Sequence, residues 1–407
     1  MATKGPGRRR ARAERTRVAA ICPPGLEEVC AAEVLELGCR PRPAGPGTVE
    51  FDATTRQLYA ANVWLRTATR VVVRLTTFRA TDFQRLQEGA AAVDWVPWIG
   101  PGMAPRFRVS TRDSKLYHTD AIAQRLHQVV GPPSLGEPEQ LFVVRIERNT
   151  VTISADSSGE GLHRRPWRTE LGQAPLRPTM AAALLLLVGW DPDVGLIDPF
   201  CGSGTLPIEA ALLATGRPPG GEREFAFHTW PTFEAGTWAS VAGEIASRRR
   251  HRPDDAGPLI GSDRDGSVVT KATANAERAG VAELVELETR VVSHLRARPG
   301  PGLVASNLPY GRRVGDGALD GLYRRFGAVL RERLPEWDVA IVAADRKLAL
   351  AADSRFVTRA RFRHGGLGVR ILHRPAASAL DSGSGEEAVV GGSGGSGEEA
   401  DEAVVSD

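Results

Sequence analysis

The stretch that decides the fold is Leu196-Ile197-Asp198-Pro199-Phe200-Cys201-Gly202-Ser203-Gly204-Thr205. Its apolar start predicts a strand at 196–198, and its end opens a helix predicted at 205–214. Gly202 and Gly204 can adopt positive φ and let a ligand approach the backbone. In an open α/β sheet, ligands bind outside the carboxyl ends of the strands. The stretch therefore predicts a ligand site, and it matches neither the dinucleotide fingerprint nor the P-loop.

Strands and helices alternate around this stretch, from residue 178 to about residue 374. The strands are predicted at 196–198, 259–262, 285–288, 302–306, 339–343 and 369–373. The helices are predicted at 178–188, 205–214, 267–279, 320–334 and 347–352. This alternation is typical of a doubly wound α/β domain with a parallel sheet.

An acid follows the strand predicted at 259–262, in Gly261-Ser262-Asp263-Arg264-Asp265. An acid at the end of the second strand can accept both hydroxyl groups of a ribose, and Asp263 stands at that position. Asp265 is close enough to share this role. A cap for the helix predicted at 267–279 is the better interpretation of Asp265.

A third polar motif, Asn307-Leu308-Pro309-Tyr310, follows the strand predicted at 302–306. The Asn307 side-chain oxygen and a backbone carbonyl can accept the N–H bonds of an amino group and orient it. Tyr310 adds an aromatic face on which a base can stack. The motif alone also fits a simple turn. Its position after the two acidic strand ends favours a site for an amino-bearing base.

The motifs DPFCGSGT at 198–205 and NLPYG at 307–311 resemble the class I methyltransferases of the THUMP-containing RNA guanine-N2 methylase family. The stretch at 165–185 is similar to this family's entry into the catalytic domain. The stretch at 225–238 is similar to the bacterial branch that methylates guanine in large-subunit ribosomal RNA. The resemblance implies a Rossmann-like α/β methyltransferase domain, with S-adenosylmethionine as cofactor. It also implies that α+β ferredoxin-like and THUMP RNA-binding domains precede that domain.

The resemblance also implies roles for single residues. The donor's methionine part would be lined by Asp198, Pro199, Phe200, Cys201, Gly202, Ser203, Gly204 and Thr205, and its ribose would be held by Asp263. The guanine amino group would be gripped by Asn307, Leu308 and Pro309, and the base would stack on Tyr310.

Two positions depart from the family pattern. The family usually has a second proline where this chain has Leu308. Because Pro309 disfavours a helical conformation for the preceding residue, the Leu308 carbonyl keeps its expected direction. The acid that normally meets the donor's adenine amino group is replaced by Val291. We expect either a reduced donor affinity or a substitute such as Ser293.

The N-terminal half mixes short strands with amphipathic helices. The strands are predicted at 18–21, 48–51, 71–76, 107–110, 141–147 and 150–154, and the helices at 26–37, 55–65, 82–91 and 118–130. The pattern predicts small α+β domains rather than one large parallel sheet. The predicted order is a basic tail (1–17), a ferredoxin-like domain (18–70), a THUMP domain (71–158), the methyltransferase domain (159–375) and an acidic Gly/Ser-rich tail (376–407).

The formal net charge of +3 hides a strong asymmetry. Residues 1–17 carry seven Lys and Arg against one Glu, whereas 376–407 carry eight acids and no base. Both tails are predicted to be disordered, because their composition cannot bury apolar surface. No apolar run approaches the roughly 20 residues that span a bilayer, and the four cysteines form no C-x-x-C pair. We expect a cytoplasmic protein with no membrane, metal or disulfide.

Two further segments carry open alternatives. The basic connector at 159–168 (GEGLHRRPWR) either contacts RNA or packs between the two halves of the chain. Packing is slightly favoured for any single residue, including His163. The segment at 225–238 either forms a flap near the site or contributes Trp230 and Trp238 to a core, and the core is favoured.

The resemblance favours an enzyme that methylates the exocyclic N2 of a guanine in 23S ribosomal RNA. One alternative keeps the chemistry on another substrate: transfer RNA, a DNA adenine or a protein glutamine amide. A second is a non-catalytic RNA-binding protein on the same fold, which the missing acid at Val291 motivates. The α+β N-terminal half argues for folded RNA.

Overall fold

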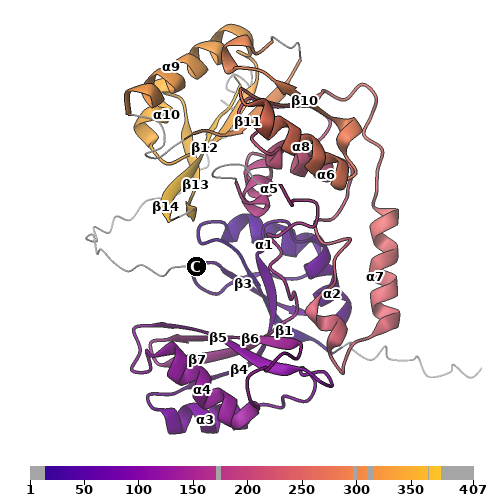
Figure 1. The fold of residues 1–407 in the computed structure, drawn as a ribbon, viewed down its shortest axis with the longest axis vertical. Helices are drawn as coiled ribbons and strands as arrows, with labels where there is room; N and C mark the ends of the chain where they lie inside the picture. The colour runs from indigo at the N-terminus through magenta and orange to yellow at the C-terminus, as the bar shows by residue number, and fades with distance from the viewer. Residues whose placement is uncertain (1–13, 171–175, 297–299, 310–315, 365, 377–407) are drawn as a thin grey trace, which may run out of the picture.

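The computed structural model describes residues 14–170, 176–296, 300–309, 316–364 and 366–376, without the side chains of 316–318 and 364. The predicted tails lie almost entirely outside these residues, but Thr16 and Arg17 already belong to strand β1 (Thr16–Ile21). No helix in the described ranges is long and apolar enough to cross a membrane. Two α/β units follow one another along the longest axis (Figure 1).

The N-terminal unit is built on one seven-stranded sheet of order β2-β3-β1-β4-β7-β6-β5. Its further strands are β2 (Arg42–Pro43), β3 (Thr48–Ala53), β4 (Arg70–Arg79), β5 (Ala104–Arg112), β6 (Glu139–Glu147) and β7 (Thr150–Asp156). Its helices are α1 (Glu27–Glu36), α2 (Thr55–Trp64), α3 (Phe83–Ala91) and α4 (Thr119–Val130). Neighbouring strands are antiparallel, except for the parallel pair β5 and β6.

Strand β4 joins the two pieces that the sequence predicts as separate domains. It pairs with β1 on one side and with β7 on the other, so the ladder continues across both pieces. The boundary predicted between residues 70 and 71 therefore falls at the first residue of this shared strand. The amphipathic pattern gives each strand a buried face, but it does not reveal which strands pair across pieces.

The C-terminal unit is built on a second seven-stranded sheet, of order β10-β9-β8-β11-β12-β14-β13. Its strands are β8 (Gly195–Asp198), β9 (Leu259–Asp263), β10 (Val285–Thr289), β11 (Gly302–Asn307), β12 (Asp338–Ala343), β13 (Val357–His364) and β14 (Leu367–Arg374). Its helices are α5 (Pro178–Leu187), α6 (Thr205–Ala214), α7 (Ala235–Ser247), α8 (Gly266–Arg278), α9 (Asp316–Arg333) and α10 (Arg346–Ala352). Only β14 runs antiparallel to its neighbours. The predicted strands and helices all occur, whereas β13 and α7 were not predicted.

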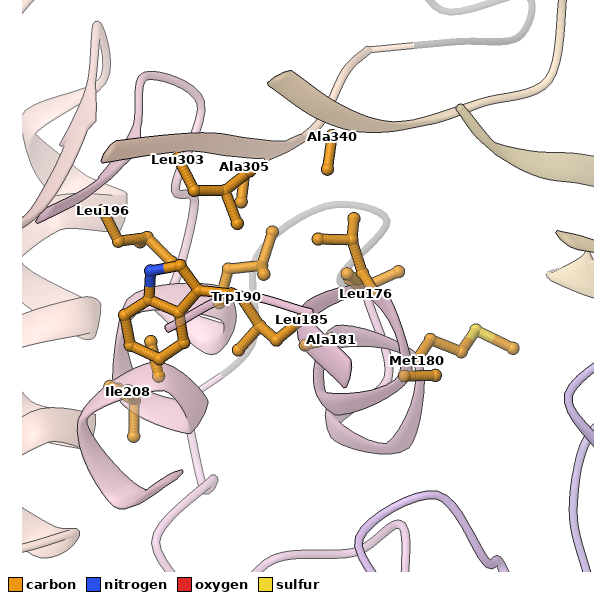
Figure 2. Close-up of a cluster of buried hydrophobic side chains, with 14 of the residues drawn as sticks. Leu176, Met180, Ala181, Leu185, Trp190, Leu196, Ile208, Leu303, Ala305 and Ala340 are labelled. Atoms are coloured by element: carbon orange, nitrogen blue, oxygen red, sulfur yellow. The ribbon is translucent and has the colours of Figure 1, made fainter. Parts of the chain in front are cut away.

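Both faces of this sheet are buried, which explains the nearly continuous apolar runs of its central strands. On one face, Leu196 and Ala305 pack against α5 and α6 (Figure 2). On the other face, Ile197 and Val304 pack with side chains of α9 and α10. Polar side chains on these strands can therefore meet a ligand only where the strands end.

The strand order reverses at β8, which lies between β9 and β11. In such sheets the crevice at this switch point, outside the carboxyl ends of the strands, is where ligands bind. Asp198 ends β8, Asp263 ends β9 and Asn307 ends β11. The fold thus brings the three predicted polar positions to one edge.

Candidate active site

The turn after β8 leaves backbone groups open to a ligand. Gly202 and Gly204 both have positive φ, 51° and 82°. A Cβ on Gly204 would lie 2.9 Å from the Cβ of Ala272 in α8, so the close packing of turn and helix requires glycine. Gly204 is also the N-cap of α6, and no side chain of the described residues caps this helix. The first N–H groups of α6 are therefore available to an acceptor on a ligand.

Asp198 links this turn to β11. Its side chain is buried, and its Oδ1 accepts hydrogen bonds from Ser306 Oγ at 2.6 Å and from the Phe200 N–H at 3.1 Å. Burial raises the pKa of Asp198 to about 7, against the opposing effect of these two hydrogen bonds, and the nearby Asp263 carboxylate raises it further. Because Ser306 precedes Asn307, the turn and the amino-group motif are held side by side.

Asp263 faces the same turn from β9. Its Oδ2 accepts the Gly202 N–H at 3.1 Å, and its Oδ1 accepts the Asp265 N–H at 3.0 Å. These bonds orient the carboxylate, and each oxygen retains a lone pair for a hydroxyl group. Asp265 accepts the Ser267 N–H at 2.9 Å and caps α8, which confirms the capping interpretation.

A cavity of about 560 Å³ opens beside Asp263, at the carboxyl ends of β9 and β10. It is lined by Arg264, Thr289, Arg290, Val291, His294 and Arg296. None of these six residues is acidic, and the side chain of Val291 is 40% exposed. The cavity offers room for a base next to Asp263, but its lining provides no carboxylate for an amino group of that base.

Asn307 carries an unpaired acceptor at this edge. Its Oδ1 atom is buried, and within the described residues it accepts no hydrogen bond. A buried polar atom left without a partner costs about 1–3 kcal/mol. Such an atom beside a ligand-binding turn indicates a ligand that brings an N–H or O–H donor.

The next two residues hold the Asn307 motif in place. The Leu308 side chain is buried in the core beneath α9, and its N–H donates to the Val342 carbonyl at 3.2 Å. The Pro309 carbonyl accepts a hydrogen bond from the Tyr323 hydroxyl at 3.3 Å. Leu308 therefore packs beneath the site and presents only its backbone to it. The predicted stacking residue, Tyr310, lies outside the described residues.

Asn275 of α8 is a site residue that the sequence analysis missed. Its Nδ2 donates to the Ser203 carbonyl in the turn and to the Glu170 carbonyl just after the connector, both at 3.0 Å. Its Oδ1 accepts from Arg278 at 2.6 Å. Asparagine is a poor helix former, so its presence on the buried face of a helix is the signal that could have found it.

The connector packs between the two units. The buried Arg165 side chain donates from Nε to Glu209 Oε1 at 2.9 Å and from Nη2 to the Arg66 carbonyl at 2.9 Å. Glu209 lies on α6, one turn beyond the ligand-binding turn. Trp167 is also buried, so interdomain packing is the correct interpretation for these two connector residues. Arg164 stays exposed.

The segment at 225–238 does not form a flap near the site. Phe227 stacks on Tyr59 of α2 with ring centroids 4.2 Å apart, and Trp230 donates from Nε1 to Gln140 Oε1 at 2.8 Å. Trp230 is buried and Trp238 packs against the same cluster, so the core interpretation is correct. Helix α7 begins within this segment, at Ala235, and lies along α2 (Figure 1).

The described parts of the chain contain no group of three or more His, Cys, Asp or Glu arranged to hold a metal ion. The observations that point to a ligand are the two glycines with positive φ, the uncapped α6, the oriented Asp263 carboxylate and the unpaired Asn307 oxygen. They fit a nucleoside-type donor beside an amino-bearing base.

Two family models match the chain. The RMKL-like methyltransferase domain matches residues 165–371, and the RlmL ferredoxin-like domain matches residues 17–72. The "Ribosomal RNA large subunit methyltransferase K/L" of Methylococcus capsulatus is 35% identical over 348 residues, which cover 81% of this chain and 47% of that relative. The chain thus spans about half the length of this relative. The "Putative RNA methyltransferase slr0064" of Synechocystis is 30% identical, over 86% of this chain and 94% of that relative.

Solved structures show the same architecture. The protein described as "SMU.472, a putative methyltransferase", crystallised with S-adenosylhomocysteine (SAH), is 27% identical with a TM-score of 0.80, covering 90% of this chain and 99% of that one. A Listeria monocytogenes protein named "predicted N6-adenine-specific DNA methylase" is 29% identical with a TM-score of 0.80, covering 89% and 97%. These similarities confirm the predicted methyltransferase class and the ferredoxin-like start, whereas the THUMP domain stays a prediction. The chain belongs to the RMKL-like methyltransferase family.

Proposed function

We propose that this protein is an S-adenosylmethionine-dependent RNA methyltransferase that modifies the exocyclic N2 of a guanine, in 23S ribosomal RNA. The observation that carries the proposal is the buried, unpaired Oδ1 of Asn307 beside the ligand-binding turn. An amino group has N–H bonds that can donate to this oxygen. A ring-carbon target would bring no N–H or O–H donor to this oxygen.

The turn at 198–205 and Asp263 are proposed to hold the donor. The open backbone of Gly202 and the uncapped α6 suit the polar methionine end, and the oriented Asp263 carboxylate suits two ribose hydroxyls. The cavity lined by Val291 suits the adenine. The bound donor supplies a methyl group already activated by its positively charged sulfur.

The protein's own contribution to the reaction is then positioning. The Asn307 oxygen and the Leu308 carbonyl accept the two N–H bonds, so that the nitrogen lone pair points at the methyl carbon. A C–N bond forms as the S–C bond breaks, and one N–H proton leaves to water. Tyr310 remains proposed as the surface on which the base stacks. No covalent enzyme intermediate is needed.

The ribosomal substrate is supported by the name of the Methylococcus relative and by the predicted RNA-binding character of the N-terminal half. It would place the protein in the cytoplasm, with RNA as its partner. Transfer RNA remains the alternative RNA substrate.

Mass spectrometry of ribosomal and transfer RNA, from cells with and without the gene, tests the substrate. Loss of one N2-methylguanosine from 23S ribosomal RNA is the expected result. Loss from transfer RNA would move the proposal to the alternative substrate, and an N6-methyladenine lost from DNA would refute guanine. Absence of any calorimetric signal with S-adenosylmethionine would favour the non-catalytic RNA-binding protein.

Donor binding is expected to weaken as the pH falls below about 7. Burial raises the pKa of Asp198 to about 7, so the carboxyl is neutral below that pH and loses its attraction for a cationic donor. Since binding favours the ionised form, the affinity should fall by up to about tenfold per pH unit below the pKa. Calorimetry between pH 8 and pH 5.5 measures the affinity for S-adenosylmethionine at each pH. Asp198→Asn should bind weakly at every pH. A flat wild-type profile contradicts the assignment.

Restoring an acid at Val291 is expected to tighten donor binding. A carboxylate at this position could accept the adenine amino group. A hydrogen bond to a charged group contributes about 1.5–3 kcal/mol. Because this position is exposed to water, which weakens such a bond, we expect donor affinity to rise by only roughly three- to tenfold. Val291→Leu is the matched control and should bind like wild type. A donor analogue whose adenine amino group is replaced by a carbonyl should show no gain with Val291→Asp. An equal gain with that analogue would contradict the adenine assignment.

A further inference from the structure

The N-terminal sheet has one face free of helices, and arginine is concentrated on it. The strand register places on this face Arg17, Arg42, Arg70, Arg74, Arg106, Arg108, Arg112 and Arg145, together with the acids Glu50, Asp52, Glu139, Glu147 and Asp156. The alternate residues of β5, Phe107 and Val109, pack towards α3 and α4 on the other face. Figure 1 shows α3 and α4 on the side of the sheet away from the C-terminal unit.

Arg106 and Arg108, two arginines of the edge strand β5, are accessible to solvent on this face. Arg106 pairs with Glu139 at 3.3 Å but remains 54% exposed. Arg108 is exposed and forms no ion pair within the described residues. Partial burial lowers the pKa of Arg108, and the neighbouring charges of Arg70 and Arg106 lower it further. Cations thus outnumber the carboxylates that could neutralise them along this edge.

The same run of positive charge continues into the connector. Arg70 donates to the Gly159 carbonyl at 2.7 Å, where the connector crosses the sheet face. Beyond it lies His163, whose Nδ1 is buried and has no partner in the described residues. Burial lowers the pKa of His163 to about 4, and the surrounding arginines, led by Arg177 and Arg164, lower it further. The Arg164 side chain is 70% exposed and Arg177 is also exposed.

The charges facing this part of the connector are mostly positive. Arg223 donates to the backbone carbonyls of Glu160, Gly161 and Arg164, and these neutral partners leave its charge uncompensated. The Glu160 carboxylate pairs with Arg164 at 3.2 Å. The carboxylates of Asp156 and Glu209 are already paired with Arg70 and Arg165, respectively. Arg177 makes no ion pair within the described ranges.

The chain just after the connector is linked to the ligand-binding turn through Asn275. The backbone of Glu170 and the carbonyl of Ser203 are both bonded to Asn275. A polyanion that follows the arginines along the connector is therefore led towards the edge where Asn307 lies.

We propose that these residues form one phosphate-binding track for the substrate RNA, running from Arg106 and Arg108 on the open sheet face to Arg164 in the connector and Arg177 at the start of α5. The proposal rests on the proposed RNA methyltransferase function and adds the surface that engages the substrate. Guanidinium groups pair with phosphate oxygens in a bidentate manner, and most protein contacts to nucleic acid go to the backbone. Few large apolar side chains lie among these arginines, which does not suit a protein partner.

The test compares RNA binding by two double variants of the full chain, R106A/R108A and R164A/R177A. The probe is a 23S ribosomal RNA transcript, titrated over a range of salt concentrations. Each lost phosphate contact should reduce the slope of log affinity against log salt by about 1. We expect each double variant to lose roughly tenfold or more in affinity at low salt. Affinity for S-adenosylmethionine should not change.

The opposite face supplies a matched control. Arg85 and Arg125 lie on α3 and α4 of the same unit, and both are exposed. The R85A/R125A variant removes the same charge and should bind RNA like wild type. The R164K/R177K variant keeps both positive charges but loses the bidentate geometry of the guanidinium group. It should recover most of the slope of log affinity against log salt. Thermal unfolding checks that the variants are folded.

Wild-type affinity and salt slope in both track variants would overturn the track while leaving the proposed function intact. An equal loss in R85A/R125A would also overturn it, because the effect would then follow net charge alone. A wild-type protein that binds S-adenosylmethionine but no RNA would overturn the proposed function together with the track.

Discussion

Replacing Asn307 by alanine is expected to lower the rate of methyl transfer by roughly 100- to 1000-fold, the range seen when one positioned polar group is removed from an active site. Affinity for S-adenosylmethionine should stay unchanged. The lost atom is the buried Oδ1, which accepts no hydrogen bond within the described residues, so its removal leaves the local fold without a broken contact. Single-turnover transfer to ribosomal RNA measures the rate of methyl transfer, and calorimetry measures the affinity for S-adenosylmethionine.

The neighbouring Ser306→Ala variant provides the reciprocal case. Ser306 donates to Asp198 at 2.6 Å, so its removal acts on the donor side of the site. We expect weaker donor binding and an apparent pKa of Asp198 shifted further upward, since a hydrogen bond that favours the ionised form is lost. Wild-type turnover in Asn307→Ala would refute Asn307 as the acceptor for the amino group.

Replacing Glu209 by glutamine is expected to destabilise the protein by about 3–5 kcal/mol, because a buried guanidinium is then left without its counter-ion. Arg165 lies 2.9 Å from Glu209, and both side chains are almost completely buried. The second arginine nearby, Arg66, lies 4.0 Å from the carboxylate, too far for a hydrogen bond, so Arg165 is the main partner. Denaturant unfolding followed by fluorescence gives the free energy of unfolding.

A double variant separates the charge from the packing. Arg165→Met combined with Glu209→Leu removes both charges and keeps most of the volume, and we expect it to recover much of the lost stability. The coupling energy from the complete cycle should then be large and favourable. Equal stability of Glu209→Gln and wild type would mean that the ion pair contributes nothing to joining the two units.

The sequence was most informative where both faces of a strand are buried. Strand β9 was predicted at 259–262 and spans Leu259–Asp263, and the acid that ends it lies at the site. Continuous apolar runs bounded by Gly and Asp leave few alternatives for such strands. The turn at 198–205 was predictable for the same reason, because glycines at its two φ-positive positions follow an apolar strand.

Strand β13 was missed because its pattern is interrupted. Arg359, Arg361 and Arg363 alternate with Ala360 and Phe362, which is a half-buried strand pattern. A register shift between Thr358 and Ala360 breaks the alternation near its start, so the run with period two is short. A highly charged edge strand of this kind resembles a loop in composition.

The contacts between distant segments could not be predicted. Tyr59 and Phe227 stack although 168 positions separate them, and through this contact the segment at 225–238 packs against α2 and not at the site. Asn275 gives no chemical motif in the sequence, because its role depends on two backbone carbonyls from other segments. Pairwise tertiary contacts of this kind follow from the assembled fold, and local patterning does not encode them.

The continuous N-terminal sheet has a practical consequence for dividing this chain into fragments or building chimaeras. A cut between residues 70 and 71 would separate β1 from β4, which are hydrogen-bonded neighbours, and each fragment would expose a new unpaired strand edge. Exposed edges of this length recruit other chains, so both fragments should aggregate. A recombinant exchange of the N-terminal unit between family members should therefore transfer residues 14–158 as one piece, with the aromatic segment at 225–238 matched to its new partner.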